Sequence, residues 1–198
     1  MRRKWVKIIS IFLLILSGSY FVFHKLTKPN LGPKTTRLYK RGFRLLEEQI
    51  GTYIKEHYTG IEKIEFSPIY VTDEGSTFSN AYVRPTIYDK YGNKATLGDQ
   101  IDKFIPLSYG LISDIVLDFD GGGNEVIELL DSNGKSVDVS NEEHLPKRAI
   151  LTEASSTDEN IELLVEDGQL IGVVKDDKGS PGAEIVYNTE LHKGDARE

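Results

Sequence analysis

The residues of this chain that could do chemistry gather in one short stretch, LDFDGGGNEVIE, residues 117–128. Asp118, Asp120, Asn124 and Glu125 offer the oxygen ligands that calcium prefers. An EF-hand loop starting at the first aspartate is excluded, because position 5 is a glycine and position 12 is a leucine. An irregular calcium site made by these four residues stays open as the weaker alternative. We favour a tight turn between two strands, since three consecutive glycines supply backbone positions with φ > 0.

Other catalytic motifs are absent from the sequence. Gly134-Lys135-Ser136 resembles the end of a phosphate-binding P-loop, but the first glycine of that motif is replaced by Leu129. The four histidines (His24, His57, His144 and His192) are scattered and form no HExxH pattern, and no GxSxG elbow occurs. The lack of cysteine excludes zinc-thiolate sites and cysteine nucleophiles. We therefore expect no enzyme, no catalytic residue and no cofactor.

Tyrosine is dense over the first half of the chain. Seven tyrosines fall in the expected helix and first strands: Tyr53, Tyr58, Tyr70, Tyr82, Tyr88, Tyr91 and Tyr109. Half-buried strand positions favour tyrosine on structural grounds alone. A binding surface is the alternative, because tyrosine offers a large contact area at low entropic cost.

Charge is divided unevenly along the chain. Eleven of the 24 basic residues lie in residues 1–46, which hold no acidic residue, so 13 basic residues face all 31 acidic ones in residues 47–198, a net charge of −18. An acidic body repels phosphate, which excludes nucleic acid as its partner. The basic segment instead favours an anionic membrane surface.

Residues 1–26 predict a membrane anchor. Their apolar run, residues 8–23, spans roughly 24 Å as a helix, and Trp5 with the flanking cations extends it toward the headgroups of a core about 30 Å thick. We expect lipid contact through residues 5–26. A cleaved signal peptide, cut at the small residues 17–19, is disfavoured because apolar residues continue beyond that point.

The orientation of the anchor follows from two opposing arguments. A first span with a short charged tail leaves that tail inside, which predicts a single-pass protein of the cell membrane with an extracytoplasmic body. Four basic residues precede the span and seven follow it, and this count alone would favour a cytoplasmic body.

An amphipathic helix and then strands are expected after a basic linker, residues 27–37. Apolar residues recur at three- and four-residue steps from about Leu38 until Gly60 ends the helix, with residues 47–49 on its polar side. Strand patterns cover residues 61–71, 81–88, 111–119 and 125–130, with Pro68 marking an edge or a bulge and turns at 91–93 and 132–134. In IELLVEDGQLIGVV, Asp167-Gly168 predicts a two-residue hairpin, preceded by a long polar loop over residues 152–160.

Together these elements predict an α+β fold: an N-terminal transmembrane helix, then one amphipathic helix packed on an antiparallel sheet in a cystatin-like arrangement, with a C-terminal hairpin. The expected organisation is an anchor (1–26), a linker (27–37), an α+β domain (38–150) and a C-terminal hairpin region with its tail (151–198).

A leader span followed by an amphipathic helix, HYTGIEKIEFSPIYV (residues 57–71) and TIYDKYGNK (residues 86–94) resembles uncharacterised membrane-anchored or lipoprotein-like surface proteins of Gram-positive cocci. The resemblance covers about a quarter of the chain and includes no catalytic motif. It implies a location at the cell surface and an α+β body. The chain departs from the lipoprotein members in lacking the lipid-attachment cysteine.

The sequence thus predicts a membrane-anchored extracytoplasmic binding or protective module, of which an immunity-type or inhibitor role against a secreted protein is one concrete form. The acidic body would complement a basic protein partner. Two alternatives stay open: a calcium-dependent or hydrolytic surface enzyme centred on Asp118, Asp120 and Glu125, and a structural subunit of a membrane complex.

Overall fold

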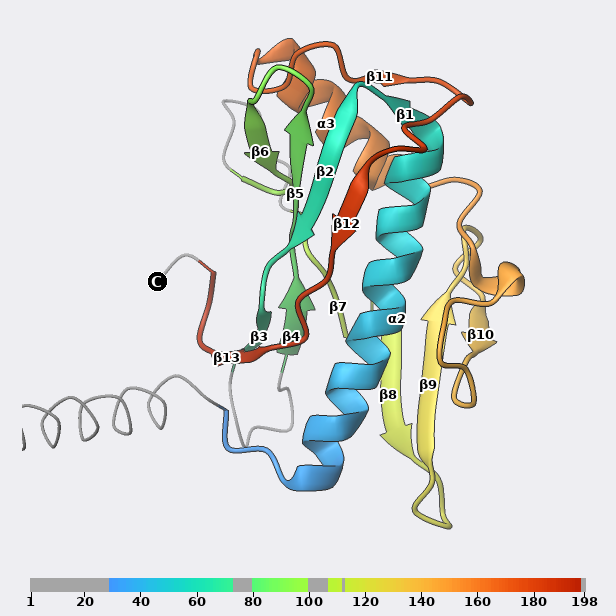
Figure 1. The fold of residues 1–198 in the computed structure, drawn as a ribbon. Helices are drawn as coiled ribbons and strands as arrows, with labels where there is room; N and C mark the ends of the chain where they lie inside the picture. The colour runs from blue at the N-terminus through green and yellow to red at the C-terminus, as the bar shows by residue number, and fades with distance from the viewer. Residues whose placement is uncertain (1–28, 73–79, 100–106, 112, 197–198) are drawn as a thin grey trace, which may run out of the picture.

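A computed structural model describes residues 29–72, 80–99, 107–111 and 113–196 and shows an α+β fold, as the sequence predicts (Figure 1). Its central element is the 25-residue helix α2, Pro33–His57. A second helix, α3, covers Ser155–Glu166, and a short 3-10 helix covers Lys147–Ala149. Within this part of the chain no helix is long and apolar enough to cross a membrane, and the predicted anchor, residues 1–26, lies outside it.

Two four-stranded sheets lie on one side of α2 (Figure 1). In spatial order, the first sheet contains β12 (Glu184–Val186), β2 (Ile61–Phe66), β5 (Pro85–Asp89) and β6 (Lys94–Thr96), and the second contains β13 (Leu191–Lys193), β3 (Ile69–Thr72), β4 (Asn80–Val83) and β7 (Tyr109–Gly110). The chain passes between the sheets at Ser67-Pro68 and again at Arg84. There the N–H of Ser67 donates to the carbonyl of Arg84 at 3.0 Å, so the joint between the two sheets is itself hydrogen-bonded. The strand predicted over residues 61–71, with Pro68 at an edge or a bulge, is instead split there into β2 and β3 of different sheets, because proline cannot donate to a strand ladder.

The sheets are mixed, whereas the sequence predicted an antiparallel sheet. β12 runs parallel to β2, and β13 runs parallel to β3. The other pairs in these two sheets are antiparallel. The strands after residue 150 thus extend sheets whose other strands lie before residue 111.

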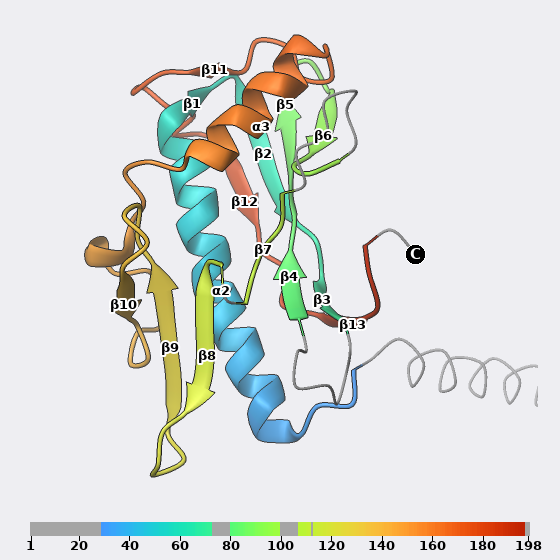
Figure 2. The same cartoon turned by 180° about the vertical axis from the view of Figure 1, so that it is seen from behind.

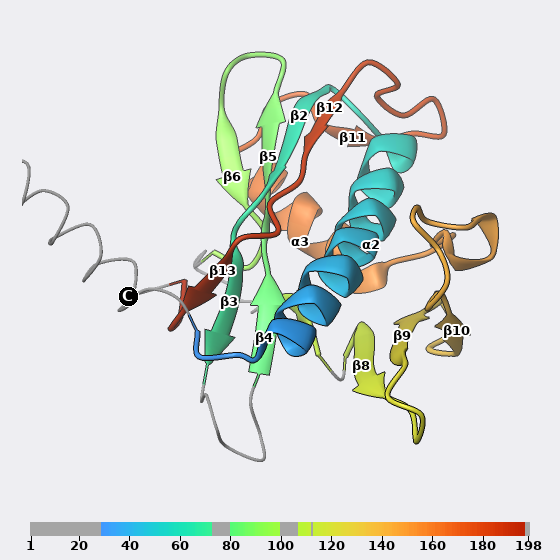
Figure 3. The ribbon, with the colours of Figure 1, turned by 60° about the horizontal axis from the view of Figure 1, so that its bottom comes forward.

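A three-stranded sheet lies across α2 from the other two (Figure 3). Its order is β10 (Ser136–Asp138), β9 (Glu125–Leu130) and β8 (Ile115–Phe119), and a separate small pair joins β1 (Tyr58–Thr59) to β11 (Val174–Lys175). The predicted strand at 125–130 is confirmed, and the one predicted at 111–119 begins later, at Ile115.

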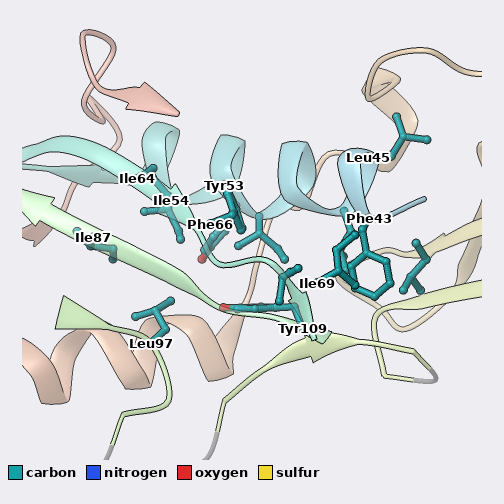
Figure 4. Packing of buried hydrophobic residues seen from close by; sticks show 14 of the residues in the cluster. Phe43, Leu45, Tyr53, Ile54, Ile64, Phe66, Ile69, Ile87, Leu97 and Tyr109 are labelled. Carbon is teal, nitrogen blue, oxygen red and sulfur yellow. The ribbon is translucent and has the colours of Figure 1, made fainter. Parts of the chain in front are cut away.

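Two glycines show how α2 is enclosed. A side chain at Gly51 would touch Ile185 and Phe66 of the first sheet, and one at Gly42 would touch Leu117 of β8. At roughly 100° per residue, positions nine apart face opposite sides of a helix. α2 therefore packs on both sides, and its apolar residues fill the core shown in Figure 4.

This double packing corrects the predicted polar side of the helix. Glu47, Glu48 and Gln49 are only 0%, 8% and 2% exposed. Each has a backbone partner: Glu47 accepts the N–H of Asn188, Glu48 accepts the N–H of Leu145, and Gln49 donates to two backbone carbonyls. The prediction of an exposed face was wrong because the sequence does not reveal that strands cover more than one side of the helix.

Both ends of the folded chain also differ from the prediction. α2 begins at Pro33, inside the predicted linker, because proline is well tolerated at the first helical position. The predicted C-terminal hairpin and the loop before it are wrong: residues 155–166 form α3 (Figure 2). Gly168, at φ 76°, follows the helix end, and its N–H donates to the carbonyl of Val165.

Candidate functional site

The stretch around Asp120 forms the turn between β8 and β9, as the sequence predicts. One carboxylate oxygen of Asp120 accepts the N–H groups of Gly122 and Asn124, both at 2.8 Å, and the other accepts the amide of Asn124 at 2.9 Å. These bonds outweigh the small effect of burial and lower the pKa of Asp120. Asp120 therefore closes the turn with its side chain.

The same turn occurs at three further places with the pattern Asp-x-x-Gly. Asp89, Asp131 and Asp176 each accept the N–H two residues ahead, and the N–H of the glycine three residues ahead donates to the aspartate carbonyl. The four glycines have positive φ: Gly92, Gly123, Gly134 and Gly179. Aspartate at the first position and a left-handed glycine at the fourth are favoured in such turns. The P-loop-like Gly134-Lys135-Ser136 belongs to one of them, the turn between β9 and β10.

The other carboxylates of the calcium candidate have their own partners. Glu125 binds Arg37 at 2.7 Å and Arg41 at 2.5 Å, and Asp118 accepts the N–H of Phe119. Asp120 and Asn124 are thus hydrogen-bonded to each other, whereas Glu125 forms ion pairs with the two arginines of α2. Among the described residues, no three His, Cys, Asp or Glu side chains lie close enough to hold a metal ion.

The histidines do not form a site. His57 stacks on Tyr53 with ring centroids 4.4 Å apart, His144 lies 3.2 Å from a Glu48 oxygen, and His192 packs edge-on against Tyr70. His24 lies outside the described residues. Since each of the three described histidines contacts a different part of the fold, none of these three is placed to work with another.

Four of the seven tyrosines are buried: Tyr53, Tyr58, Tyr82 and Tyr109. Two of them meet at Asp158 of α3, which accepts the hydroxyl protons of Tyr53 at 2.8 Å and Tyr58 at 2.7 Å and also binds Lys175 at 2.6 Å. Burial raises the pKa of Asp158, but the hydrogen bonds from Lys175 and the tyrosines outweigh it, and its pKa lies below the ordinary value. Burial and the bond to Asp158 raise the pKa of Tyr58. These four side chains come from α2, α3, β1 and β11, and their hydrogen bonds and ion pair hold the four elements together. We therefore assign the cluster a structural role.

A cavity of about 390 Å³ lies between α2, β9 and the start of α3, and several of its polar groups are engaged in hydrogen bonds. Gln49 donates to Leu130 and Ala149, and Tyr109 bonds to Thr157 at 2.7 Å. Asp114 accepts the N–H of Gly110 at 2.8 Å. The hydroxyl of Ser113, which also lines the cavity, donates to Asp114 at 2.7 Å, and the described lining residues include no histidine, lysine or arginine.

Exposed apolar side chains provide the better candidate. Of the large hydrophobic residues in the described part of the chain, four are strongly exposed: Tyr91 at 73%, Val174 at 58%, Ile171 at 49% and Val116 at 38%. Val116 lies on β8, whereas Ile171 and Val174 flank Gly172 in sequence, and the ring of Tyr91 lies against that glycine. We call Tyr91, Ile171 and Val174 the distal surface.

A single buried carboxylate holds two residues of the distal surface. Asp89 is fully buried, and its oxygens accept the N–H of Tyr91 at 2.8 Å and the N–H of Ile171 at 2.7 Å. The Tyr91 ring lies against Gly172, where a Cβ would stand 3.1 Å from the ring. Val174 follows two residues later and pairs with Thr59. Backbone hydrogen bonds thus hold the three residues of the distal surface in place.

The β1–β11 pair, which carries Val174, lies at the C-terminal end of α2, opposite the end where Pro33 begins the helix (Figure 1). A helix of 25 residues is about 37 Å long, which separates the two ends by roughly that distance. The sequence indicated Tyr91 as one of seven tyrosines of a possible binding surface, but it did not indicate Ile171 and Val174, which fell in a predicted strand.

Comparisons of the chain with protein-family models, with curated proteins and with solved structures found no match.

Proposed function

We propose that this chain is a membrane-anchored binding module, with its body outside the cell membrane and its distal surface docking a protein partner. The observation that carries the proposal is the exposure of Tyr91, Ile171 and Val174, the first two held by backbone hydrogen bonds to the buried Asp89 and the third paired with Thr59 of β1. Apolar and aromatic groups gathered on a rigid surface are typical of protein interfaces, where tyrosine is enriched. Neutralisation of a secreted protein, as by an immunity protein or an inhibitor, is one concrete form.

The arrangement of the molecule supports tethering. The apolar leader precedes α2 in sequence, and the distal surface lies at the other end of that helix. An anchor formed by residues 1–26 would therefore leave the distal surface facing away from the bilayer, about 37 Å from the start of the helix. The proposal includes a single-pass topology and a cystatin-like arrangement of the helix on the sheet.

Site-specific photo-crosslinking tests the proposed function. A photoreactive amino acid would replace Val174 in the full chain, expressed in its own cells, and a matched chain would carry it at Val116. Both valines are exposed on short strands, but only Val174 lies on the distal surface. We expect a discrete protein adduct from position 174 and little from position 116. Absence of an adduct at position 174, or equal adducts at both positions, would contradict the proposal.

A further inference from the structure

We propose that the partner docked by the distal surface is a positively charged protein, recognised by the apolar residues together with the acidic side of α3. This inference rests on the proposed function and names the chemistry of its partner. It follows from the charges of α3 and from the way α3 adjoins β11.

The helix α3 carries four acidic residues and no basic one in its sequence SSTDENIELLVE. Glu159, Glu162 and Glu166 are all exposed and recur at steps of three and four residues, which places them along one side of the helix. We call these three residues the acidic stripe.

The charge of the acidic stripe is not balanced within the described part of the chain. None of its three carboxylates takes part in an ion pair there, and the last turn of α3 holds no basic residue. Glu166 and the following Asp167 stand at the C-terminal end of the helix, where the dipole is negative and acidic side chains are unfavourable. A cationic partner would relieve this repulsion.

The helix α3 adjoins the β1–β11 pair that carries Val174, and Glu162 of the acidic stripe acts electrostatically on Tyr58 of β1. Lys175, next to Val174, reaches across to Asp158 of α3, with the amine 2.6 Å from the carboxylate. Apolar groups beside uncompensated carboxylates fit the common pattern of an interface with an apolar centre and a charged rim.

The cations nearby do not reverse this pattern. Lys175 is neutralised by Asp158. The other exposed lysines of the neighbouring turns and strands are Lys90, Lys94 and Lys178, and they are outnumbered by five exposed acidic residues, Glu159, Glu162, Glu166, Asp167 and Asp177. The surrounding field is therefore acidic. It would attract a basic protein and repel nucleic acid or anionic lipid.

The test neutralises the acidic stripe in the chain that carries the photoreactive group at position 174. The variant is Glu159→Gln, Glu162→Gln and Glu166→Gln, since glutamine is nearly as good a helix former as glutamate. The matched control, Glu143→Gln, Glu184→Gln and Glu190→Gln, removes the same charge from exposed residues outside α3. Circular dichroism would verify that both variants fold.

We expect the stripe variant to lower the adduct yield at least about fivefold, with the control within about twofold. Raising external salt from roughly 0.05 M to 0.5 M should lower the yield of the unaltered chain similarly, because charge steering is screened. The captured protein should be basic. An acidic captured protein, or equal yields from stripe and control variants, would overturn the inference while leaving the proposed function in place. No adduct from the unaltered chain would overturn both.

Discussion

Aspartate plays one recurring role at the scale of single residues: its carboxylate closes a turn by accepting backbone N–H groups. Asp120 does so in the glycine-rich stretch that could have been a calcium loop, and Asp89 does so while fixing Tyr91 and Ile171. The repeated Asp-x-x-Gly pattern was visible in the sequence, and it is the feature that could have decided between turn and metal site. The sequence did not show that one of these turns, the one at Asp89, also supports an exposed apolar surface.

A calcium titration tests this account of Asp120. Since its oxygens already accept three hydrogen bonds and Glu125 is bound by two arginines, calcium would have to displace internal partners. We expect no binding heat when calcium is added to the full chain in detergent. Micromolar affinity that is lost in Asp118→Asn would contradict the turn and restore the irregular calcium site.

Glu47 gives a pH-dependent prediction. Burial raises the pKa of this carboxyl from its ordinary 4.5 to about 8, against the opposing effects of the Asn188 N–H and Arg44. Below pH 4.5 both folded and unfolded chains hold the proton. Between pH 4.5 and 8 the unfolded chain releases it and the folded chain keeps it, so stability falls as the pH rises.

The variant Glu47→Gln should lose this dependence, because an amide stays neutral. At pH 8 we expect it to be more stable than the unaltered chain by about 2–4 kcal/mol, with a much smaller difference at pH 4.5, since one pKa unit corresponds to about 1.4 kcal/mol. Urea unfolding followed by circular dichroism at the two pH values measures this. Glu159→Gln, at an exposed position, serves as control. An unchanged pH slope in Glu47→Gln would refute the assignment.

Elements were predicted well where a local pattern had one interpretation, and poorly where it had two or where the strand's partner was distant. The helix α2, the strand β9 and the break at Pro68 all follow from their own residues. The hairpin predicted at Asp167-Gly168 became the end of α3, because a left-handed glycine terminates a helix as readily as it forms a hairpin turn. Short strands such as β7 and β13 exist only through distant partners, which the sequence does not name.

A pair of glycines tests how β1 meets the loop after α3. Gly60 and Gly92 have nearly the same backbone angle, φ 84° and 87°, but a Cβ at Gly60 would overlap the carbonyl oxygen of Gly172, whereas Gly92 faces open space. We expect Gly92→Ala to cost about 1 kcal/mol, from backbone strain alone. Gly60→Ala should cost roughly 2–3 kcal/mol more. Equal losses in thermal or urea unfolding would show that the close contact does not matter.

At the scale of the whole molecule, the two ends of α2 differ in the charge and the apolar character of the surface around them. The end that follows the apolar leader is basic, with Lys34, Arg37 and Lys40 exposed, and the other end carries the distal surface and the acidic stripe. This polarity agrees with the uneven charge seen along the sequence. A membrane-tethered body would place its basic end toward anionic headgroups and its acidic end toward a partner.

One labelling measurement tests the central claim, that a tethered body outside the membrane docks a protein through the distal surface. The chain has no cysteine, so single cysteines at Gly121, in the open β8–β9 turn, and at Val174 can be compared without background. Intact cells would be treated with a membrane-impermeant maleimide before and after a high-salt wash. We predict rapid labelling at position 121 throughout, and labelling at position 174 that is slow before the wash and rapid after it. Labelling at position 121 only after cell lysis, or equal rates at both positions before the wash, would contradict the account.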